Sequence, residues 1–330
     1  MSVWLPTAPC TPQACVEPAG STRTVPRTVL RLTAVLVLLA AGIALSPLAR
    51  RPPGSRGRIP SWLVRRWCRW IVRAAGVRVR VTGAAAPAGG LLLVANHVSW
   101  LDIPLLAAVR PARMLAKTEV RRWPVAGRLA ARGGALFIDR DRLRALPETV
   151  ARIARALRDG QAVGVFPEGS TWCGRAQGPF RRAVFQAALD AGVPVQPVRI
   201  HYRRADGAPG TAAAFVGDDT LPASLWRVVS AHGLVAEVRV HGPIPPGGHP
   251  DRRLLALAAE RAVLPRPHQL QVTAPVVQHR TVPGLTRHPL HTGEEPALHG
   301  HVAGGRDAVH GPQEGAGVPA GQRVAGQFPP

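Results

Sequence analysis

The stretch Asn96-His97-Val98-Ser99-Trp100-Leu101-Asp102 decides the fold because of what lies on either side of it. An apolar run before it, residues 91–95, predicts a buried strand, and residues 103–108 predict the start of a helix. A histidine and an aspartate therefore stand at a strand-to-helix corner. Loops of this kind leave the carboxyl ends of sheet strands, where α/β folds place reactive groups.

The spacing of His97 and Asp102 restricts how they can meet. Five residues along a regular helix place two side chains roughly 140° apart, so the histidine must lie in the loop and the aspartate at the helix start. Pro104 agrees, because proline is tolerated in the first helical turn. Such a pair suits a general base, since the carboxylate orients the imidazole and stabilises its charged form. The alternatives are that Asp102 caps the helix, alone or with Ser99, and that His97 is a polar loop residue.

Around this corner the sequence alternates between strand and helix patterns. Strands are predicted at 77–81, 91–95, 113–117, 135–138, 162–166, 193–198 and 234–240, and helices at 125–132, 147–157, 180–188 and 252–262. This order predicts an α/β fold with a mostly parallel mixed sheet flanked by helices, in a domain over residues 55–264.

The N-terminal region has a different composition. Residues 1–28 contain several prolines and little periodicity, which predicts a disordered leader. Residues 29–50 contain an uncharged apolar run about as long as a minimal bilayer span, so we expect a transmembrane or membrane-inserted helix. A cleaved signal peptide and a buried core helix are the alternatives. Arginines are more numerous after this segment than before it, so we expect the domain that follows to lie on the cytoplasmic side of the cell membrane.

Residues 61–75 have the pattern of an amphipathic helix. Its arginines fall within an arc of roughly 100° on a helical wheel, and Leu63, Trp67, Trp70 and Ile71 lie outside that arc. This arrangement predicts a helix in the interface of an anionic membrane. An ordinary surface helix that packs its apolar side on the domain has the same pattern.

The charge of the chain requires an anionic partner. Lys and Arg number 42 against 19 Asp and Glu, a formal net charge of +23. A nucleic-acid binder is one class with this balance, but the arginines cluster beside the apolar segment and there is 1 tyrosine for base stacking. We therefore expect a membrane surface and no nucleic acid. The cysteines Cys10, Cys15, Cys68 and Cys173 form no Cys-x-x-Cys pair, so we infer neither a disulfide framework nor a zinc site.

Residues 265–330 are rich in Gly, Pro and His without a period, which predicts a disordered tail. The histidines of this tail could bind a metal, although no two keep a helical or finger-like spacing. A tail so unlike the domain is also what a reading-frame error would produce.

Polar residues end three of the predicted strands: His97 with Asp102, then Asp139-Arg140, then Glu168-Gly169-Ser170. In a parallel sheet these ends lie at one edge, so the groups could form one site. Glycine permits close approach of backbone N–H groups to an anion, and an arginine binds a phosphate bidentately.

At these positions the chain resembles the glycerolipid and lysophospholipid acyltransferases, typified by 1-acylglycerol-3-phosphate acyltransferase. Residues 96–102 are similar to the NH-x-S-x-x-D motif, residues 134–140 to G-x-x-F-I-D-R, and residues 166–170 to F-P-E-G-T/S. Residues 193–198 are similar to V-P-[IV]-x-P-V, and residues 116–120 to A-K-x-E-L. The resemblance covers about residues 60–262. The chain departs from it after Ser170, where Thr171-Trp172-Cys173 replace an arginine and a serine of many members, and this leaves the choice of acceptor head group open.

The resemblance implies a direct acyl transfer. His97 would deprotonate an acceptor hydroxyl while Asp102 fixes its tautomer, and the alkoxide would attack the thioester of acyl-CoA or acyl-carrier protein, with no metal, cofactor or covalent acyl-enzyme. Arg140 would bind the acceptor phosphate, with Glu168, Gly169 and Ser170 shaping the site. Lys117, the only lysine of the chain, would add a second cation. Glu168 could instead pair with Arg140 or cap a helix.

The most favoured acceptor is 1-acylglycerol-3-phosphate. A lyso-ornithine lipid is an alternative acceptor, and a catalytically inactive membrane scaffold is an alternative of another class.

Overall fold

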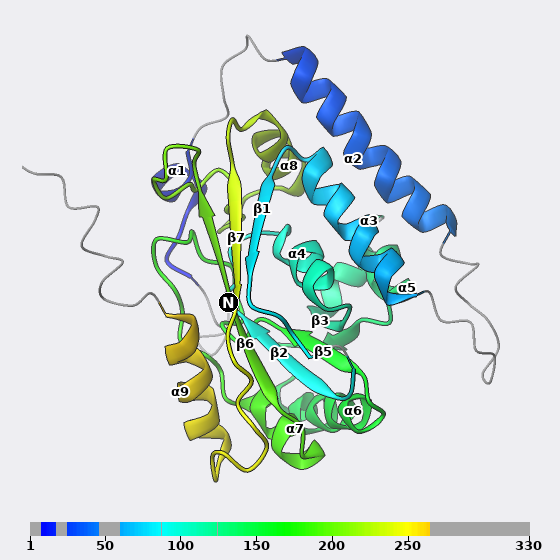
Figure 1. Ribbon diagram of the computed structural model, residues 1–330, viewed down its shortest axis with the longest axis vertical. Helices are drawn as coiled ribbons and strands as arrows, with labels where there is room; N and C mark the ends of the chain where they lie inside the picture. Colours follow the sequence, from blue (N-terminus) through cyan, green and yellow to red (C-terminus); the bar gives the residue numbers. More distant parts are fainter. Residues whose placement is uncertain (1–7, 18–24, 46–59, 87, 124, 265–330) are drawn as a thin grey trace, which may run out of the picture. The chain divides into compact units, whose positions relative to one another are not determined.

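A computed structural model describes residues 8–17, 25–45, 60–86, 88–123 and 125–264 (Figure 1). The helices are α1 Pro12–Cys15, α2 Val25–Leu45, α3 Ser61–Ala74, α4 Asp102–Val109, α5 Ala126–Arg132, α6 Leu146–Arg158, α7 Ala183–Ala191, α8 Leu221–Ser230 and α9 Arg252–Val263. The strands are β1 Arg78–Thr82, β2 Leu91–Ala95, β3 Arg113–Lys117, β4 Leu136–Ile138, β5 Ala162–Val165, β6 Val195–Arg203 and β7 Val235–Val240. The predicted tail, residues 265–330, lies outside the described residues.

The sheet has 7 strands in the order β1-β7-β6-β2-β5-β3-β4. Every neighbouring pair is parallel except β6 and β7, which are antiparallel, so the predicted mixed and mostly parallel sheet is confirmed. The carboxyl ends of β2, β3, β4 and β5 therefore lie at one edge of the sheet, which is the edge that carries the predicted site residues.

Helices cover both faces of the sheet, which explains why β2 is apolar at every position. Leu91, Leu93 and Ala95 of β2 pack in a core with residues of α3, α4 and α8. Leu92 and Val94 face the opposite core, formed with α6, α7 and α9. All five β2 side chains are buried, so β2 and the loop after it are held from both sides.

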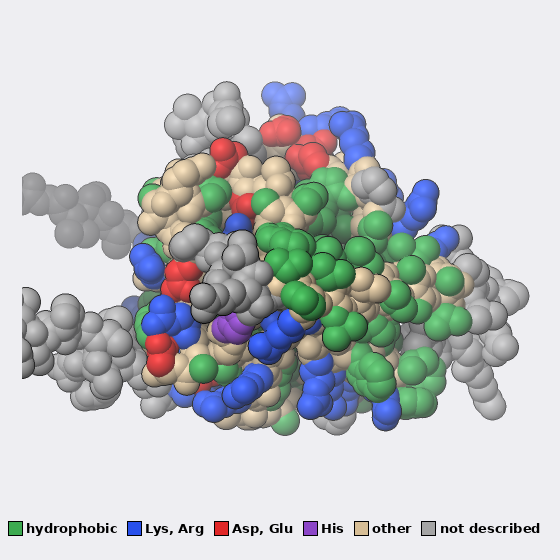
Figure 2. Space-filling model, turned by 90° about the horizontal axis from the view of Figure 1, so that it is seen from above, with side chains coloured by type: hydrophobic (Ala, Val, Ile, Leu, Met, Phe, Trp, Pro, Cys, Tyr) green, Lys and Arg blue, Asp and Glu red, His purple; other side chains and the backbone are tan. Residues whose placement is uncertain are grey.

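Helix α2 begins four residues earlier than the predicted apolar segment, and the end of that segment lies outside the described residues. α2 is long and apolar enough to cross a membrane, with a mean hydropathy of 2.3. One side packs on the domain: the Arg31 side chain donates to the carbonyls of Val229 and Ala231, both at 2.9 Å, and the Trp67 indole donates to Leu38 at 3.1 Å. The other side exposes apolar side chains, and Figure 2 shows hydrophobic side chains gathered along this part of the surface.

Helix α3 packs partly on the domain, as a surface helix would, and its place in a membrane interface stays a prediction. Ile71 is buried against the domain, whereas Trp70 and Leu63 are exposed. Trp67 is half-buried and contacts α2 at Leu38 and Gly42.

The structure differs from the sequence analysis in two places. Residues 8–17 of the expected disordered leader have a defined structure: Thr11 caps α1, and Cys10 packs in the main core with 5% of its surface exposed. Pro12 is tolerated there because it lies in the first helical turn. Helix α8 was not predicted, although Thr220 supplies a regular N-terminal cap and Pro222 follows in the first turn.

Candidate active site

The loop after β2 wraps around the carboxylate of Asp102. Oδ2 of Asp102 accepts from the backbone N–H groups of Val98 at 2.7 Å and Ser99 at 2.8 Å, and it lies 2.9 Å from Nδ1 of His97. Asp102 is the first residue of α4 and is fully buried. Asp102 alone does not cap α4, because its carboxylate accepts from N–H groups that precede the helix and not from those of its first turn. The same oxygen contacts the histidine, as the functional interpretation requires.

The contact with Asp102 determines which nitrogen of His97 can act as a base. An ionised carboxylate only accepts hydrogen bonds, so Nδ1 carries the proton and Nε2 carries the free electron pair. The His97 side chain is 20% exposed, in contrast to its buried partner. A basic nitrogen on a partly exposed ring, oriented by a buried carboxylate, is the arrangement that general-base catalysis requires.

The loop after β5 holds His97 from the other side. The imidazole stacks on Phe166 with ring centroids 3.9 Å apart and an interplanar angle of 8°. The backbone N–H of His97 donates to Oε2 of Glu168 at 2.7 Å, and its carbonyl accepts from Trp172 N–H at 2.8 Å. These contacts fix the ring plane and the backbone of His97 before any substrate binds.

Glu168 contacts the backbone of the loops beside His97. Its side chain is buried, and its two oxygens accept from the backbone N–H groups of His97 and of Gly178, the latter at 3.3 Å. Burial raises the pKa of the Glu168 carboxyl to about 8, although the two N–H donors act in the opposite direction. Glu168 therefore ties the loop after β5 to the loop after β2, on which His97 lies. It does not pair with Arg140, whose guanidinium contacts a backbone carbonyl.

Arg140 follows β4 and reaches across to the same loop. Its Nη1 donates to the carbonyl of Gly169, a residue with φ of +78° that glycine adopts without strain. Burial lowers the pKa of Arg140, although an arginine of this kind keeps its charge near neutral pH. The pKa of Lys117, at the end of β3, is lowered by burial and then by the charge of Arg140. The structure thus places the two cations of the prediction near each other. Ser170 follows Gly169 and is half-buried.

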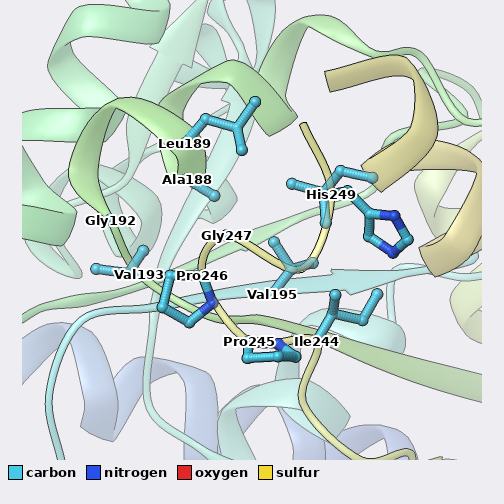
Figure 3. A pocket seen from close by; sticks show the side chains of 11 residues that line it. Ala188, Leu189, Gly192, Val193, Val195, Ile244, Pro245, Pro246, Gly247 and His249 are labelled. Carbon is cyan, nitrogen blue, oxygen red and sulfur yellow. The ribbon is translucent and has the colours of Figure 1, made fainter. Parts of the chain in front are cut away.

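An enclosed cavity lies elsewhere in the molecule. Figure 3 shows it between α7 and the segment around Pro245, where its lining is mainly aliphatic. It borders the start of β6, at the opposite end of the sheet from His97. With a volume of about 40 Å³, it has room for little more than one water molecule, so we assign it no part in the site.

The chain is similar to known acyltransferases. Residues 78–201 match the family model described as Acyltransferase. Over 247 residues the chain is 41% identical to the lyso-ornithine lipid O-acyltransferase of Pseudomonas aeruginosa. The alignment covers 72% of this chain and 92% of that protein. The chain belongs to the lysophospholipid acyltransferase family.

Further relatives lie in the same family. The 1-acyl-sn-glycerol-3-phosphate acyltransferase of Neisseria gonorrhoeae is 40% identical over 149 residues, 45% of this chain and 58% of that protein. The fold is similar to the crystal structure of PlsC, the 1-acyl-sn-glycerophosphate acyltransferase of Thermotoga maritima, with a TM-score of 0.54 and 22% sequence identity. The match covers 73% of this chain and 93% of the PlsC chain. This last match shows a shared fold.

The acyltransferase site includes a residue that the sequence did not suggest. The hydroxyl of Tyr202 donates to Oδ1 of Asp102 at 2.7 Å. Strand β6 was predicted to end at Val198, so Tyr202 fell outside the predicted sheet. The available signal was that Tyr202 is the single tyrosine of the chain and alternates with buried Ile200 on the same strand. Asn96 also bridges to β6, donating to and accepting from the backbone of Ile200 at 2.8 Å.

We expect Tyr202→Phe to lower kcat by roughly 10-fold to 100-fold, because a hydrogen bond to a buried charged group contributes about 1.5–3 kcal/mol. The KM values for both substrates should stay the same, since Tyr202 acts through Asp102 and touches neither substrate. Thr149→Val is the matched control, because it removes a buried hydroxyl from α6, away from the site. If both variants lose stability but neither loses kcat, Tyr202 only supports the fold.

Proposed function

We propose that this chain transfers a fatty acyl group from a thioester donor, acyl-CoA or acyl-carrier protein, to the hydroxyl of a lyso-ornithine lipid. The observation that supports acyl transfer is the pair formed by partly exposed His97 and buried Asp102, 2.9 Å apart at the carboxyl edge of the sheet. The reaction as proposed needs no metal and no cofactor.

The two substrates and His97 account for every bond and proton of the proposed step. Nε2 of His97 takes the proton of the acceptor hydroxyl, and the oxygen attacks the thioester carbonyl carbon. A new C–O bond forms as the C–S bond breaks, and the imidazolium returns its proton to the leaving thiolate. Asp102 stabilises the imidazolium while it exists.

The acceptor is proposed from how far the relatives match. The chain aligns with 92% and 90% of the lyso-ornithine lipid O-acyltransferases of Pseudomonas aeruginosa and Brucella abortus. It aligns with 58% of the 1-acyl-sn-glycerol-3-phosphate acyltransferase of Neisseria gonorrhoeae. An ornithine head group can present a carboxylate, which suits the guanidinium of Arg140 as well as a phosphate does.

A second candidate acceptor is 1-acylglycerol-3-phosphate. The observation that favours it is the pair of cations: Lys117 pairs with Ile138 at the ends of the parallel strands β3 and β4, and Arg140 follows two residues later. Two adjacent cations are better suited to a phosphate monoester, which carries up to two negative charges, than to a single carboxylate.

Membrane association of the domain is proposed to occur through α2 and α3. α2 lies along the domain, with contacts at Arg31, Leu38 and Gly42, so it does not project freely from the domain. Its exposed apolar side and the exposed Trp70 of α3 are suited to lipid, and the arginines of α3 to anionic head groups. We infer that the domain lies on the cytoplasmic side of the cell membrane, with its site open to lysolipids of that leaflet.

The acceptor can be tested with the full-length chain purified in detergent. Labelled acyl-CoA or acyl-carrier protein would be incubated with lyso-ornithine lipid, with 1-acylglycerol-3-phosphate and with a neutral lysolipid. We expect kcat/KM to be highest for the lyso-ornithine lipid. Preference for the phosphate acceptor would select the second candidate, and no acylation of any acceptor by the folded protein would contradict the proposed reaction.

We expect Arg140→Lys to raise the acceptor KM by roughly 10-fold to 100-fold. Lysine keeps the charge but loses one of the two hydrogen bonds that a guanidinium donates to an anionic head group, each worth about 1.5–3 kcal/mol. The KM for the thioester should not change. Arg152→Lys is the matched control, since Arg152 hydrogen-bonds to Phe137 of the same strand β4 at 2.9 Å. A rise in the thioester KM instead would mean that Arg140 contacts the donor.

A further inference from the structure

Three cysteines meet beside the active site, although they come from segments far apart in the sequence. The sulfur atoms of Cys10, Cys15 and Cys173 all lie within 4.8 Å of one another. Cys10 and Cys173 are buried, with 5% and 4% of their surfaces exposed, and Cys15 is half-buried. The acyl-transfer step uses none of these thiols.

Helix α1 brings two of the cysteines together. Cys10 precedes the N-cap residue Thr11, and Cys15 is the last helical residue, whose N–H donates to the Thr11 carbonyl at 3.0 Å. One helical turn therefore separates the two thiols. The segment is also attached to the domain: the N–H of Glu17 donates to Oγ1 of buried Thr211 at 3.0 Å.

The third cysteine lies in the loop that holds His97. Trp172, the residue before Cys173, donates its backbone N–H to the His97 carbonyl at 2.8 Å. The backbone N–H groups of Arg175 and Ala176 donate hydrogen bonds to the sulfur of Cys173. A thiolate is the form that binds metals.

We propose that Cys10, Cys15 and Cys173 together bind one thiophilic metal ion, Zn²⁺ by preference, and thereby fasten the N-terminal segment to the catalytic loop. Zinc sites with three protein ligands complete their tetrahedron with water. Zn–S bonds of about 2.3 Å place sulfurs roughly 3.8 Å apart in a tetrahedron, so the sulfurs need to approach by no more than about 1 Å. The N–H donors around Cys173 supply the outer hydrogen bonds that such ligands usually have.

A disulfide is the competing use of these thiols. It would join only two of them, whereas the structure gathers three in mutual contact. The sequence offered no sign of this site, because Cys173 is 158 residues away from Cys15 and no Cys-x-x-Cys pair exists.

The test uses the full-length chain, carrying an affinity tag without histidine or cysteine. Because the C-terminal tail is rich in histidine, Cd²⁺ is the first probe: its thiolate complexes have an ultraviolet charge-transfer absorbance that imidazole complexes lack. We expect this absorbance to saturate at one Cd²⁺ per chain, and added Zn²⁺ to suppress it. Limited proteolysis should cut the N-terminal segment more slowly when Zn²⁺ is present.

Variants assign the ligands. Cys10→Ser and Cys15→Ser change only the N-terminal segment, so the domain should still fold, and each should weaken Cd²⁺ binding at least 10-fold. Cys68→Ser is the matched control, because Cys68 is a buried cysteine of α3 outside the cluster, and it should bind as the wild type does. No charge-transfer absorbance in the reduced wild type would overturn the proposal. Unchanged binding in Cys10→Ser and Cys15→Ser would do the same, as would a disulfide between two of the three cysteines in the protein as purified, seen by mass spectrometry.

Discussion

Replacing His97 with alanine is expected to lower kcat by about two to four orders of magnitude while the protein stays folded, which is the range of a lost general base. The structure gives three reasons. Asp102 holds Nδ1, which leaves Nε2 as the base, and Phe166 fixes the ring plane by stacking. The ring is also partly exposed, so its removal leaves no large cavity. The measurement is single-turnover transfer of a labelled acyl group, with thermal unfolding as the check on folding.

The control for this variant is His249→Ala. His249 lies beside the small cavity at the other end of the sheet, so its loss should leave the rate unchanged. If folded His97→Ala turns over within tenfold of the wild type, His97 is not the base, and the proposed chemistry fails at its first step.

The fold could be predicted from sequence because local patterns and tertiary packing agree. The apolar pattern of β2 and the helix patterns on either side of it predicted parallel strands, and the structure confirms them. The predictions failed where long-range contacts decide the structure. Residues 8–17 have no helical or strand period long enough to predict an element, and they are ordered because Cys10 enters a core formed elsewhere and Thr211 binds their backbone.

The same distinction applies to the site: the contact between residues close in sequence could be predicted, and a contact from a distant strand could not. His97 and Asp102 are five residues apart, so a local argument could bring them together. Glu168, which follows β5, was placed at the same sheet edge by the parallel-strand pattern. Tyr202 of β6 was missed, because only the order of the strands brings it to Asp102. Strand pairing depends on contacts between distant segments, and single-sequence patterns do not specify it.

Replacing Asp102 with asparagine is expected to lower kcat by about two to four orders of magnitude with little change in folding. Asparagine keeps one oxygen, which can accept from Val98 and Ser99 as Oδ2 of Asp102 does now. Its amide nitrogen would then face the Tyr202 hydroxyl, which can accept as well as donate. The loop should therefore survive, while the negative charge that stabilises the imidazolium of His97 is lost.

Comparison with Asp102→Ala separates the charge of Asp102 from its role in the loop. Alanine leaves the N–H groups of Val98 and Ser99 without an acceptor in a buried place, and each unpaired group costs about 1–3 kcal/mol. We therefore expect Asp102→Ala to unfold at a lower temperature than Asp102→Asn, with a comparably low kcat. A folded Asp102→Asn enzyme with nearly full kcat would show that the carboxylate only holds the loop. His97 would then act as a base without the negative charge of Asp102.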